Sequence, residues 1–186
     1  MRLFIAVPLP DQVRAALGQL QERLAEAQAD VKWVEPANLH LTLKFLGDMP
    51  EGQVPAIIEA LATAARSAAR VELGLGALGA FPSMASPRVV WVGLHEGAQP
   101  LAALAQQLEL LGRTFGWPHA ERPFSPHLTL GRVRSPRGRA QLVHALREAA
   151  WRPPSPWPAT AVTLYQSVLS SSGPRYTALA DAPLGS

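Results

Sequence analysis

Cysteine is absent from the 186 residues of the sequence. This absence excludes disulfides, cysteine-ligated zinc, iron–sulfur clusters and a thiol nucleophile, but it does not fix a cellular compartment. Long apolar runs are also missing, since no stretch reaches 18 consecutive apolar residues, and we expect no membrane span. The apolar run at residues 3–7 is too short for a signal peptide. We therefore expect a soluble, cytoplasmic protein.

Charged residues are few, at 17% of the chain against 48% hydrophobic residues, which is typical of a globular protein. The net charge of +3 comes from 15 arginines and 2 lysines set against 14 acidic residues. Arginine suits bidentate phosphate recognition. However, the chain is also rich in alanine and proline, as a GC-rich genome would produce. The charge therefore permits a phosphate-bearing partner without requiring one.

The length predicts one domain, spanning residues 1–186. Hydrophobic periodicity predicts helices at 13–28, 54–69, 101–115 and 138–150, with Asp11 as the N-cap of the first. It predicts strands at 2–7, 31–34, 39–46, 71–81, 88–94, 127–133, 161–169 and 175–179. We expect loops at 81–87, 116–126 and 152–158, a turn at 170–174, and a bulge or close backbone approach at glycines 74, 76 and 79. Interspersed strands and helices favour an α/β or α+β fold with two layers.

One tetrapeptide, His-Leu-Thr-Leu, occurs twice, at residues 40–43 and 127–130. The copies are 87 positions apart, nearly half the chain. A proline-containing segment precedes each copy and a glycine follows within four residues. Two such His-x-Thr pairs arise by chance in roughly 1–2% of comparable sequences, and the matching leucines lower that chance further. The sequence therefore contains an internal repeat centred on these motifs.

The alternation of side chains along a strand places histidine and threonine of each motif on one face, about 7 Å apart, and the leucines on the other. The leucines are expected in the core. By the same alternation, Lys44 shares the face of His40 and Thr42. Phe45 is expected to pack in the core, and Arg132 to point away from His127.

A face with two imidazoles and two hydroxyls fits one kind of chemistry. Two histidines that titrate near neutral pH can act as base and acid in one turnover. Two threonine hydroxyls can bind the non-bridging oxygens of a phosphate. The set suits attack at a phosphate that lies between an entering and a leaving oxygen, where positioning and charge stabilisation do most of the work. It requires no metal and no cofactor.

The paired motifs resemble the 2H phosphoesterase superfamily, and within it the bacterial and archaeal RNA 2′,3′-cyclic phosphodiesterases, also called 2′-5′ RNA ligases. The resemblance covers nearly the whole chain and includes the segments RLFIAV, HLTLKFLG, PRVVWVGL, RPFSPHLTLGRV and TLYQSVLSSSGPRYTAL. It implies an α+β fold of two pseudo-symmetric lobes. Each lobe would be a small, mostly antiparallel sheet with helices outside, and the lobes would face each other across a central groove.

The resemblance also implies an activity. It is the metal-independent hydrolysis of a 2′,3′-cyclic phosphate, on RNA or on a nucleoside, to a 2′-phosphate by a monomeric enzyme, with 2′-5′ joining of tRNA halves as a related reaction. By motif position, His40 would give a proton to the departing 3′-oxygen and His127 would activate water. Thr42 and Thr129 would hold the phosphate. Lys44 and Arg132 are further candidates for substrate binding.

Several alternatives stay open at this point. The substrate could be a 2′-5′ oligonucleotide or another cyclic-phosphate sugar. The chain could be a non-catalytic RNA-binding module that uses the arginines at 132, 134, 137 and 139. A histidine-ligated metal hydrolase is less favoured, because the sequence contains neither HExxH nor HxH. His95, His119 and His144 lack the repeat and are interpreted as surface residues. The five tryptophans are interpreted mainly as packing residues, although one could stack a base.

Overall fold

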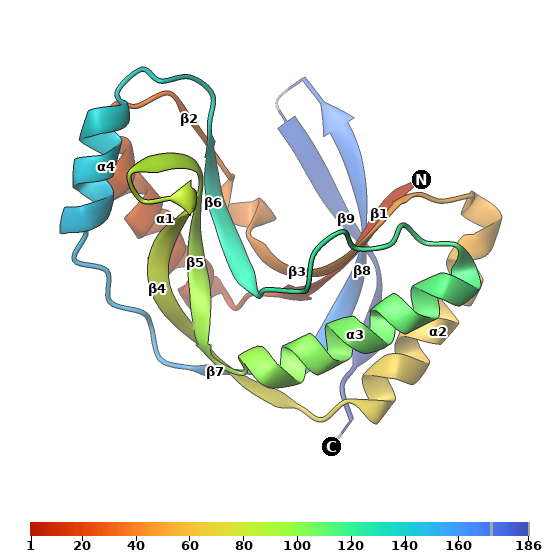
Figure 1. The fold of residues 1–186 in the computed structure, drawn as a ribbon. Helices are drawn as coiled ribbons and strands as arrows, with labels where there is room; N and C mark the ends of the chain where they lie inside the picture. Colours follow the sequence, from red (N-terminus) through yellow and green to blue (C-terminus); the bar gives the residue numbers. More distant parts are fainter. Residues whose placement is uncertain (172, 186) are drawn as a thin grey trace.

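The computed structural model describes residues 1–171 and 173–185 and has an α+β fold with two antiparallel sheets (Figure 1). Sheet A has the strand order β3-β1-β8-β9, and its strands are β3 (His40–Asp48), β1 (Arg2–Pro8), β8 (Ala161–Ser170) and β9 (Gly173–Pro183). Sheet B has the order β2-β6-β5-β4-β7, with β2 (Val31–Trp33), β6 (His127–Val133), β5 (Ser86–Glu96), β4 (Val71–Ser83) and β7 (Trp157–Ala159). The predicted fold class is confirmed.

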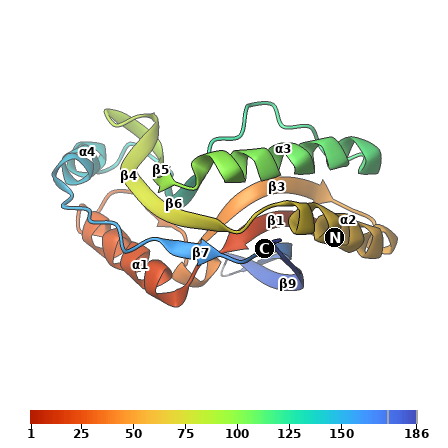
Figure 2. The ribbon, with the colours of Figure 1, turned by 90° about the horizontal axis from the view of Figure 1, so that it is seen from below.

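Each sheet has its own pair of helices (Figures 1 and 2). Helices α2 (Val54–Ser67) and α3 (Ala98–Phe115) lie with sheet A, where α2 contacts β8 and β9, and α3 contacts β3. Helices α1 (Asp11–Ala25) and α4 (Arg139–Glu148) lie with sheet B, and α4 contacts β5. Two short 3₁₀ helices, η1 (Pro36–Asn38) and η2 (Glu51–Gln53), flank β3. In the part of the chain that the structure describes, no helix is long and apolar enough to cross a membrane.

The two sheets draw strands from both halves of the chain. In sheet A, β1 lies between β3 from the first half and β8 from the second. In sheet B, β6 from the second half lies between β2 and β5 from the first. The two lobes are therefore not the two sequence repeats, because each lobe combines elements of both.

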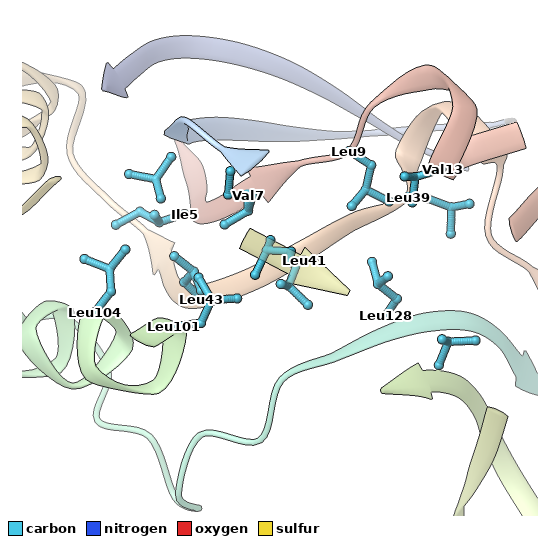
Figure 3. Packing of buried hydrophobic residues seen from close by; sticks show 14 of the residues in the cluster. Ile5, Val7, Leu9, Val13, Leu39, Leu41, Leu43, Leu101, Leu104 and Leu128 are labelled. Carbon is cyan, nitrogen blue, oxygen red and sulfur yellow. The ribbon is translucent and has the colours of Figure 1, made fainter. Parts of the chain in front are cut away.

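The leucines of both motifs enter the core, as predicted. Leu41, Leu43, Leu128 and Leu130 are all buried in one hydrophobic cluster. In Figure 3, Leu43 lies beside Leu101 of α3, and Leu128 belongs to the same cluster. Burying these side chains leaves the opposite face of each strand to the histidines and threonines.

Three local predictions were wrong. Asp11 is the first residue of α1 rather than its N-cap, which is Pro10, and the Asp11 carboxylate binds Arg14 instead. Residues 81–87 are not a loop, because β4 and β5 form a hairpin through most of that segment. Residues 157–158 begin strand β7. The prolines in these two segments favoured loops in the sequence analysis. A missing N–H is tolerated at both places, because β7 is an edge strand and the tip of the β4–β5 hairpin extends beyond the pairing of β5 with β6.

The prediction for the glycines of β4 is confirmed. Its pairing with β5 shifts register at Gly74. Gly79 lies directly under an indole ring, and a Cβ there would be 2.3 Å from Cζ2 of Trp91. Glycine is therefore required for Trp91 to lie on the sheet. The turn predicted at residues 170–174 includes Ser172, which lies outside the described residues; β8 and β9 flank it.

Candidate active site

The two histidines occupy equivalent places, since His40 begins β3 and His127 begins β6, and these two strands contact each other. The Nδ1 atom of His40 lies 2.6 Å from the carbonyl oxygen of Asn38, and Nδ1 of His127 lies 2.8 Å from the carbonyl oxygen of Ser125. A carbonyl only accepts hydrogen bonds, so Nδ1 carries the proton in both rings. Nε2 is therefore the atom of each ring that is left to exchange a proton.

A β-bulge follows the first threonine. In the pairing of β3 with β1, Thr42 lies opposite Ala6 and Lys44 lies opposite the adjacent residue Ile5, so Leu43 is an extra residue. One extra residue reverses the facing of every side chain after it. Lys44 therefore shares the leucine face, and Phe45 shares the face of His40 and Thr42.

The second motif carries the same bulge at the same position. In the pairing of β6 with β5, Thr129 lies opposite Trp91 and Gly131 lies opposite Val90, so Leu130 is the extra residue. Arg132 consequently faces the same side as His127 and Thr129. We call these two surfaces the histidine faces: that of sheet A carries His40, Thr42 and Phe45, and that of sheet B carries His127, Thr129 and Arg132.

The prediction that Lys44 shares the face of His40 was wrong, and the bulge is the physical reason. The Lys44 side chain is only 5% exposed. Its Nζ binds the Glu109 carboxylate of α3 and donates to the carbonyl of Pro118, which lies 2.5 Å away. Lys44 therefore joins β3 to α3 and to the segment that leads to β6, and it does not face a substrate beside His40.

Glu109 is the centre of a small polar cluster below sheet A. Burial raises the pKa of its carboxyl group, but hydrogen bonds from Lys44, the Ala120 N–H and His119, together with the charge of Lys44, outweigh burial and bring the pKa to about 2. His119 contacts the second carboxylate oxygen. His119 is therefore a partner of Glu109, while His144 is exposed on α4 and His95 packs over Gly74.

The same register change corrects two further predictions. Phe45 is 66% exposed instead of buried in the core. Arg132 does not point away from His127 but lies on its face, opposite Val89 on one side and Lys32 on the other. The histidine face of sheet B therefore has two adjacent cations.

Aromatic rings surround His40. Its ring centroid lies 4.7 Å from that of Phe4, 5.1 Å from Tyr176 and 6.2 Å from Tyr165. Burial among these rings lowers the pKa of His40, while the hydrogen bond to Asn38 raises it by less. In the free protein, His40 is thus held toward its neutral form.

Two rings flank His127 on the other sheet. Phe81 lies 5.4 Å away and meets it edge to face, and Trp91 lies 6.4 Å away. Phe81 also contacts Trp91 at 5.0 Å. The rings that flank both histidines were not identified from the sequence, although the only two tyrosines in the chain, Tyr165 and Tyr176, both lie in predicted strands.

The two histidine faces act on each other electrostatically. Burial raises the pKa of Tyr176 on β9, and the positive charges of Arg2 and Arg132 lower it in part. Arg132 belongs to sheet B and Tyr176 to sheet A. Lys32 of sheet B also reaches β9, because its Nζ would lie 3.9 Å from a Cβ placed on Gly173. The space beside Tyr176 therefore has positive potential from both sheets, which favours an anion.

Gln21 is a buried residue that positions the second motif and that sequence reasoning missed. Its buried side-chain amide donates to the carbonyl oxygens of Leu130, at 2.9 Å, and Val34, at 2.8 Å. The Val34 N–H donates to the same Leu130 carbonyl. Gln21, which lies on α1, thereby provides a hydrogen bond to the backbone carbonyl of Leu130, the bulge residue of β6. An amide on the apolar face of that helix, between Leu17 and Leu24, was the available signal.

Among the described residues, the motifs coincide neither with a group of metal ligands nor with the cavity between α2 and α3. Among the described residues, no group of three or more His, Asp or Glu side chains is placed to hold a metal ion. A cavity of about 640 Å³ lies between α2 and α3, and Ala60, Leu111 and Phe115 are among its lining residues. It contains no residue of either HLTL motif, so the candidate site is the pair of histidine faces.

Comparison with known proteins agrees with this geometry. The profile of a family described as LigT like phosphoesterase matches twice, at residues 7–91 and 92–176, with one HLTL motif in each match. The chain is 36% identical over 177 residues to an RNA 2′,3′-cyclic phosphodiesterase of Methanothermobacter thermautotrophicus, with 95% of each chain covered. It is 38% identical over 188 positions to one of Thermus thermophilus, covering 96% of this chain and 88% of the relative. The crystal structure of TT0787 of Thermus thermophilus is similar, with a TM-score of 0.81, 33% identity, and 99% and 98% of the chains covered.

Proposed function

Because this chain belongs to the LigT like phosphoesterase family, we propose that it hydrolyses a 2′,3′-cyclic phosphate, at an RNA end or on a nucleoside, to a 2′-phosphate. One observation carries the proposal. Two strands that begin with the same HLTL motif each present an imidazole whose Nδ1 is bound to a carbonyl two residues upstream, which leaves Nε2 for proton transfer. One acid and one base are what hydrolysis of a cyclic phosphodiester requires.

The reaction assigned to the pair uses one proton transfer at each end of the phosphate. His127 takes a proton from water through Nε2, and the water oxygen forms a new bond to phosphorus. The bond from phosphorus to the 3′-oxygen breaks in line with that attack. His40 gives the Nε2 proton to the departing 3′-oxygen. The products are a 3′-hydroxyl and a 2′-phosphate, and one turnover moves one proton on to His127 and one off His40.

Charge on the phosphate is held by groups on the same faces. Thr42 and Thr129 lie beside the histidines and are assigned the non-bridging oxygens. Arg132, brought to the face of His127 by the bulge, is assigned a phosphate contact as well. Lys44 is left out of this set because its ammonium is bound to Glu109 and the Pro118 carbonyl.

The environment of His40 bears on its role as the acid. Burial lowers its pKa in the free protein, whereas the negative phosphate of a bound substrate favours the imidazolium. Binding of substrate would thus recruit the proton that His40 later donates. The profile of kcat/KM against pH is expected to be bell-shaped, because turnover needs one protonated and one neutral imidazole. A rate that climbs steadily from pH 5 to 9 would contradict acid–base catalysis by the pair.

Three finer properties belong to the same proposal. The reaction needs no metal, because the two imidazoles supply both proton transfers. A 5′-hydroxyl in place of water would give a 2′-5′ linkage, which is the joining reaction of tRNA halves. The chain is a single domain, residues 1–186, since both sheets use strands from both halves, and it acts as a monomer.

The deciding experiment is a product assay. The protein is incubated with adenosine 2′,3′-cyclic phosphate in EDTA, and 2′-AMP is separated from 3′-AMP by chromatography. A 2′-AMP product establishes both the departing oxygen and the independence from added metal. A 3′-AMP product reverses the assignment of the departing oxygen. Absence of turnover here, on RNA with a cyclic end and on 2′-5′ oligonucleotides would favour a non-catalytic RNA-binding module.

A further inference from the structure

Asn38 makes two different hydrogen bonds beside His40. Its backbone carbonyl accepts the Nδ1 proton of His40 over a distance of 2.6 Å. Its side-chain amide lies 2.8 Å from the backbone carbonyl oxygen of Pro174 on β9. A carbonyl only accepts hydrogen bonds, so the amide turns its Nδ2 atom toward Pro174 and donates to it. One residue therefore connects the proposed acid of the reaction to a strand 136 positions further along the chain.

The hydrogen bond from Asn38 to Pro174 joins opposite edges of sheet A. Asn38 ends η1, two residues before β3 begins, and β3 and β9 are the two edge strands of this sheet. Tyr176 of β9 meets the ring of His40 edge to face at 5.1 Å. It also lies 4.9 Å from Phe4 of the inner strand β1. The sheet thus curls over Phe4, and the beginning of β9 packs against His40.

The beginning of β9 belongs to a hairpin end that extends past the rest of sheet A. Strand β1 pairs with β8 at residues 163–166, and β8 and β9 continue to pair with each other beyond that point. Pro174 lies in this extension opposite Leu169, which is 72% exposed. A two-stranded hairpin is at best marginally stable by itself. The amide of Asn38 gives this extension a fixed attachment.

The second motif lacks an equivalent attachment. Ser125 is the residue whose carbonyl binds His127, and it is exposed, so that this hydrogen bond lies at the surface. Asn38 is half-buried and its hydrogen bond to His40 is partly buried. The two histidines therefore make the same bond to the backbone, but only the carbonyl that holds His40 belongs to a residue whose side chain is tied to another strand.

We propose that Asn38 is a positioning residue for the proton-donating step. Held by the Pro174 carbonyl, it keeps its own carbonyl on Nδ1 of His40 and keeps the β8–β9 extension against the ring. The inference rests on the proposed function, in which His40 protonates the departing 3′-oxygen. With Nδ1 fixed as the proton-bearing atom of the neutral ring, Nε2 is the atom that gains and gives the proton. A displacement of about 1 Å in such a group costs up to about a hundredfold in rate.

Nitrogen NMR of the free protein tests the positioning directly. When His40 is neutral, the chemical shifts of its two ring nitrogens show which of them carries the proton. Wild type should carry it on Nδ1. Asn38→Leu, which keeps the branched shape without a donor, should show a mixture of the two forms, and Asn38→Ala is a second variant should the first fail to fold. A ring that stays protonated on Nδ1 in the folded variant overturns the inference.

Kinetics separate positioning from a purely structural role. Asn38→Leu should lower kcat about tenfold on adenosine 2′,3′-cyclic phosphate and leave KM unchanged, because the acid is misplaced only for the chemical step. On the analogue with sulfur in place of the 3′-oxygen, its kcat should equal that of the wild type, since a thiolate leaves without a proton. An equal loss on both substrates would mean that Asn38 only supports the fold, and would overturn the inference.

Trp151→Phe is the matched control. The indole Nε1 of Trp151 donates to the Gly76 carbonyl of β4 at 2.9 Å, which is the same kind of bond but involves neither motif. The variant should match the wild type in kcat and in the protonation of His40. A changed His40 ring in Trp151→Phe would overturn the assignment to Asn38. A wild type that hydrolyses no cyclic end would defeat the proposed function alone, because the NMR result does not depend on turnover.

Discussion

The two HLTL strands begin alike and then diverge. Both start with a histidine tied to a carbonyl two residues upstream, and both bulge after the threonine. After the bulge, the residue that faces the core is Lys44 in β3 and Gly131 in β6. The residue that faces the histidine is Phe45 in β3 and Arg132 in β6. The bulge decides where each position points, and the residue at that position decides whether the face gains an aromatic ring or a cation.

The core-facing position shows what the difference requires of the neighbouring elements. Lys44 needs an acidic partner under the sheet, and α3 provides Glu109. Gly131 instead makes room for a tryptophan, because a Cβ there would be 2.7 Å from Cε3 of Trp33. In sheet A, the residue after the bulge is therefore held by an ion pair between Lys44 and Glu109. In sheet B, the indole of Trp33 packs on the residue after the bulge, and the amide of Gln21 binds the carbonyl of the bulge residue.

The largest expected effect on activity comes from replacing either of the two motif histidines. His40→Ala and His127→Ala should each lower kcat by about 10²- to 10⁴-fold, because each removes one proton transfer. A substrate analogue with sulfur in place of the 3′-oxygen separates the two roles, since a thiolate leaves without a proton. It should rescue His40→Ala but not His127→Ala, as measured by steady-state kinetics. Rescue of His127→Ala alone would reverse the assignment.

The next largest effect is on stability and comes from replacing Lys44, the core-facing lysine of β3 whose place in β6 is taken by Gly131. Lys44→Met should lower the free energy of unfolding by about 3 kcal/mol, because it leaves the carboxylate of Glu109 without its buried partner. Denaturant unfolding followed by circular dichroism measures it. Asp11→Asn removes a partner from the exposed Asp11–Arg14 pair and serves as the control, with no measurable change expected. Equal stability of Lys44→Met and wild type would mean that the pair contributes nothing to the fold.

A smaller effect on activity is expected from replacing the two motif threonines. Thr42→Val and Thr129→Val should each lower kcat/KM about tenfold, because each removes one hydrogen bond to a charged oxygen. If the two hydroxyls hold different oxygens, the double variant should lose about a hundredfold, the product of the single effects. Kinetics on the cyclic mononucleotide measure all three variants. A double variant no worse than either single one would place both hydroxyls on one oxygen.

The smallest effect is on stability as a function of pH. Burial lowers the folded-state pKa of His40 below 6.5, so its contribution is present above pH 6.5 and is lost as the pH falls through the lowered value. The pKa of Glu109 falls from 4.5 to about 2, so a second loss begins below pH 4.5 and continues to about pH 2. Unfolding measured from pH 8 to pH 2 should show both losses. His40→Asn should remove only the first, and His144→Asn, on an exposed histidine, should remove neither.

The sequence predicted the motifs and their chemistry but not the course of each strand beyond its threonine. His40 and Thr42 share a face because only one residue separates them, and the same holds for His127 and Thr129. Alternation fails at the next step, since the pattern of residues does not reveal that Leu43 and Leu130 are extra residues in their pairings. The errors at Lys44, Phe45 and Arg132 all come from that one step. Only strand pairing, which is a long-range property, reveals a bulge.

Which strands pair to form each sheet could likewise not be predicted from the sequence. The repeat predicts two related halves, and the helices and most strands were predicted close to their observed positions. Nothing local, however, indicates that β1 pairs with β8 or that β6 inserts between β2 and β5. Those pairings depend on which edges meet after the chain has collapsed.

Because each sheet combines strands from both halves of the chain, neither sheet can be completed early in synthesis. Strand β1 is an inner strand of sheet A, and one of its two neighbours, β8, is synthesised only after all of sheet B. A chain growing from its N-terminus therefore carries β1 with one edge unpaired through most of translation. Such a topology is expected to fold late and slowly, dominated by distant pairings. The edge of β1 that awaits β8 is the segment where a nascent chain of this protein most needs protection from aggregation.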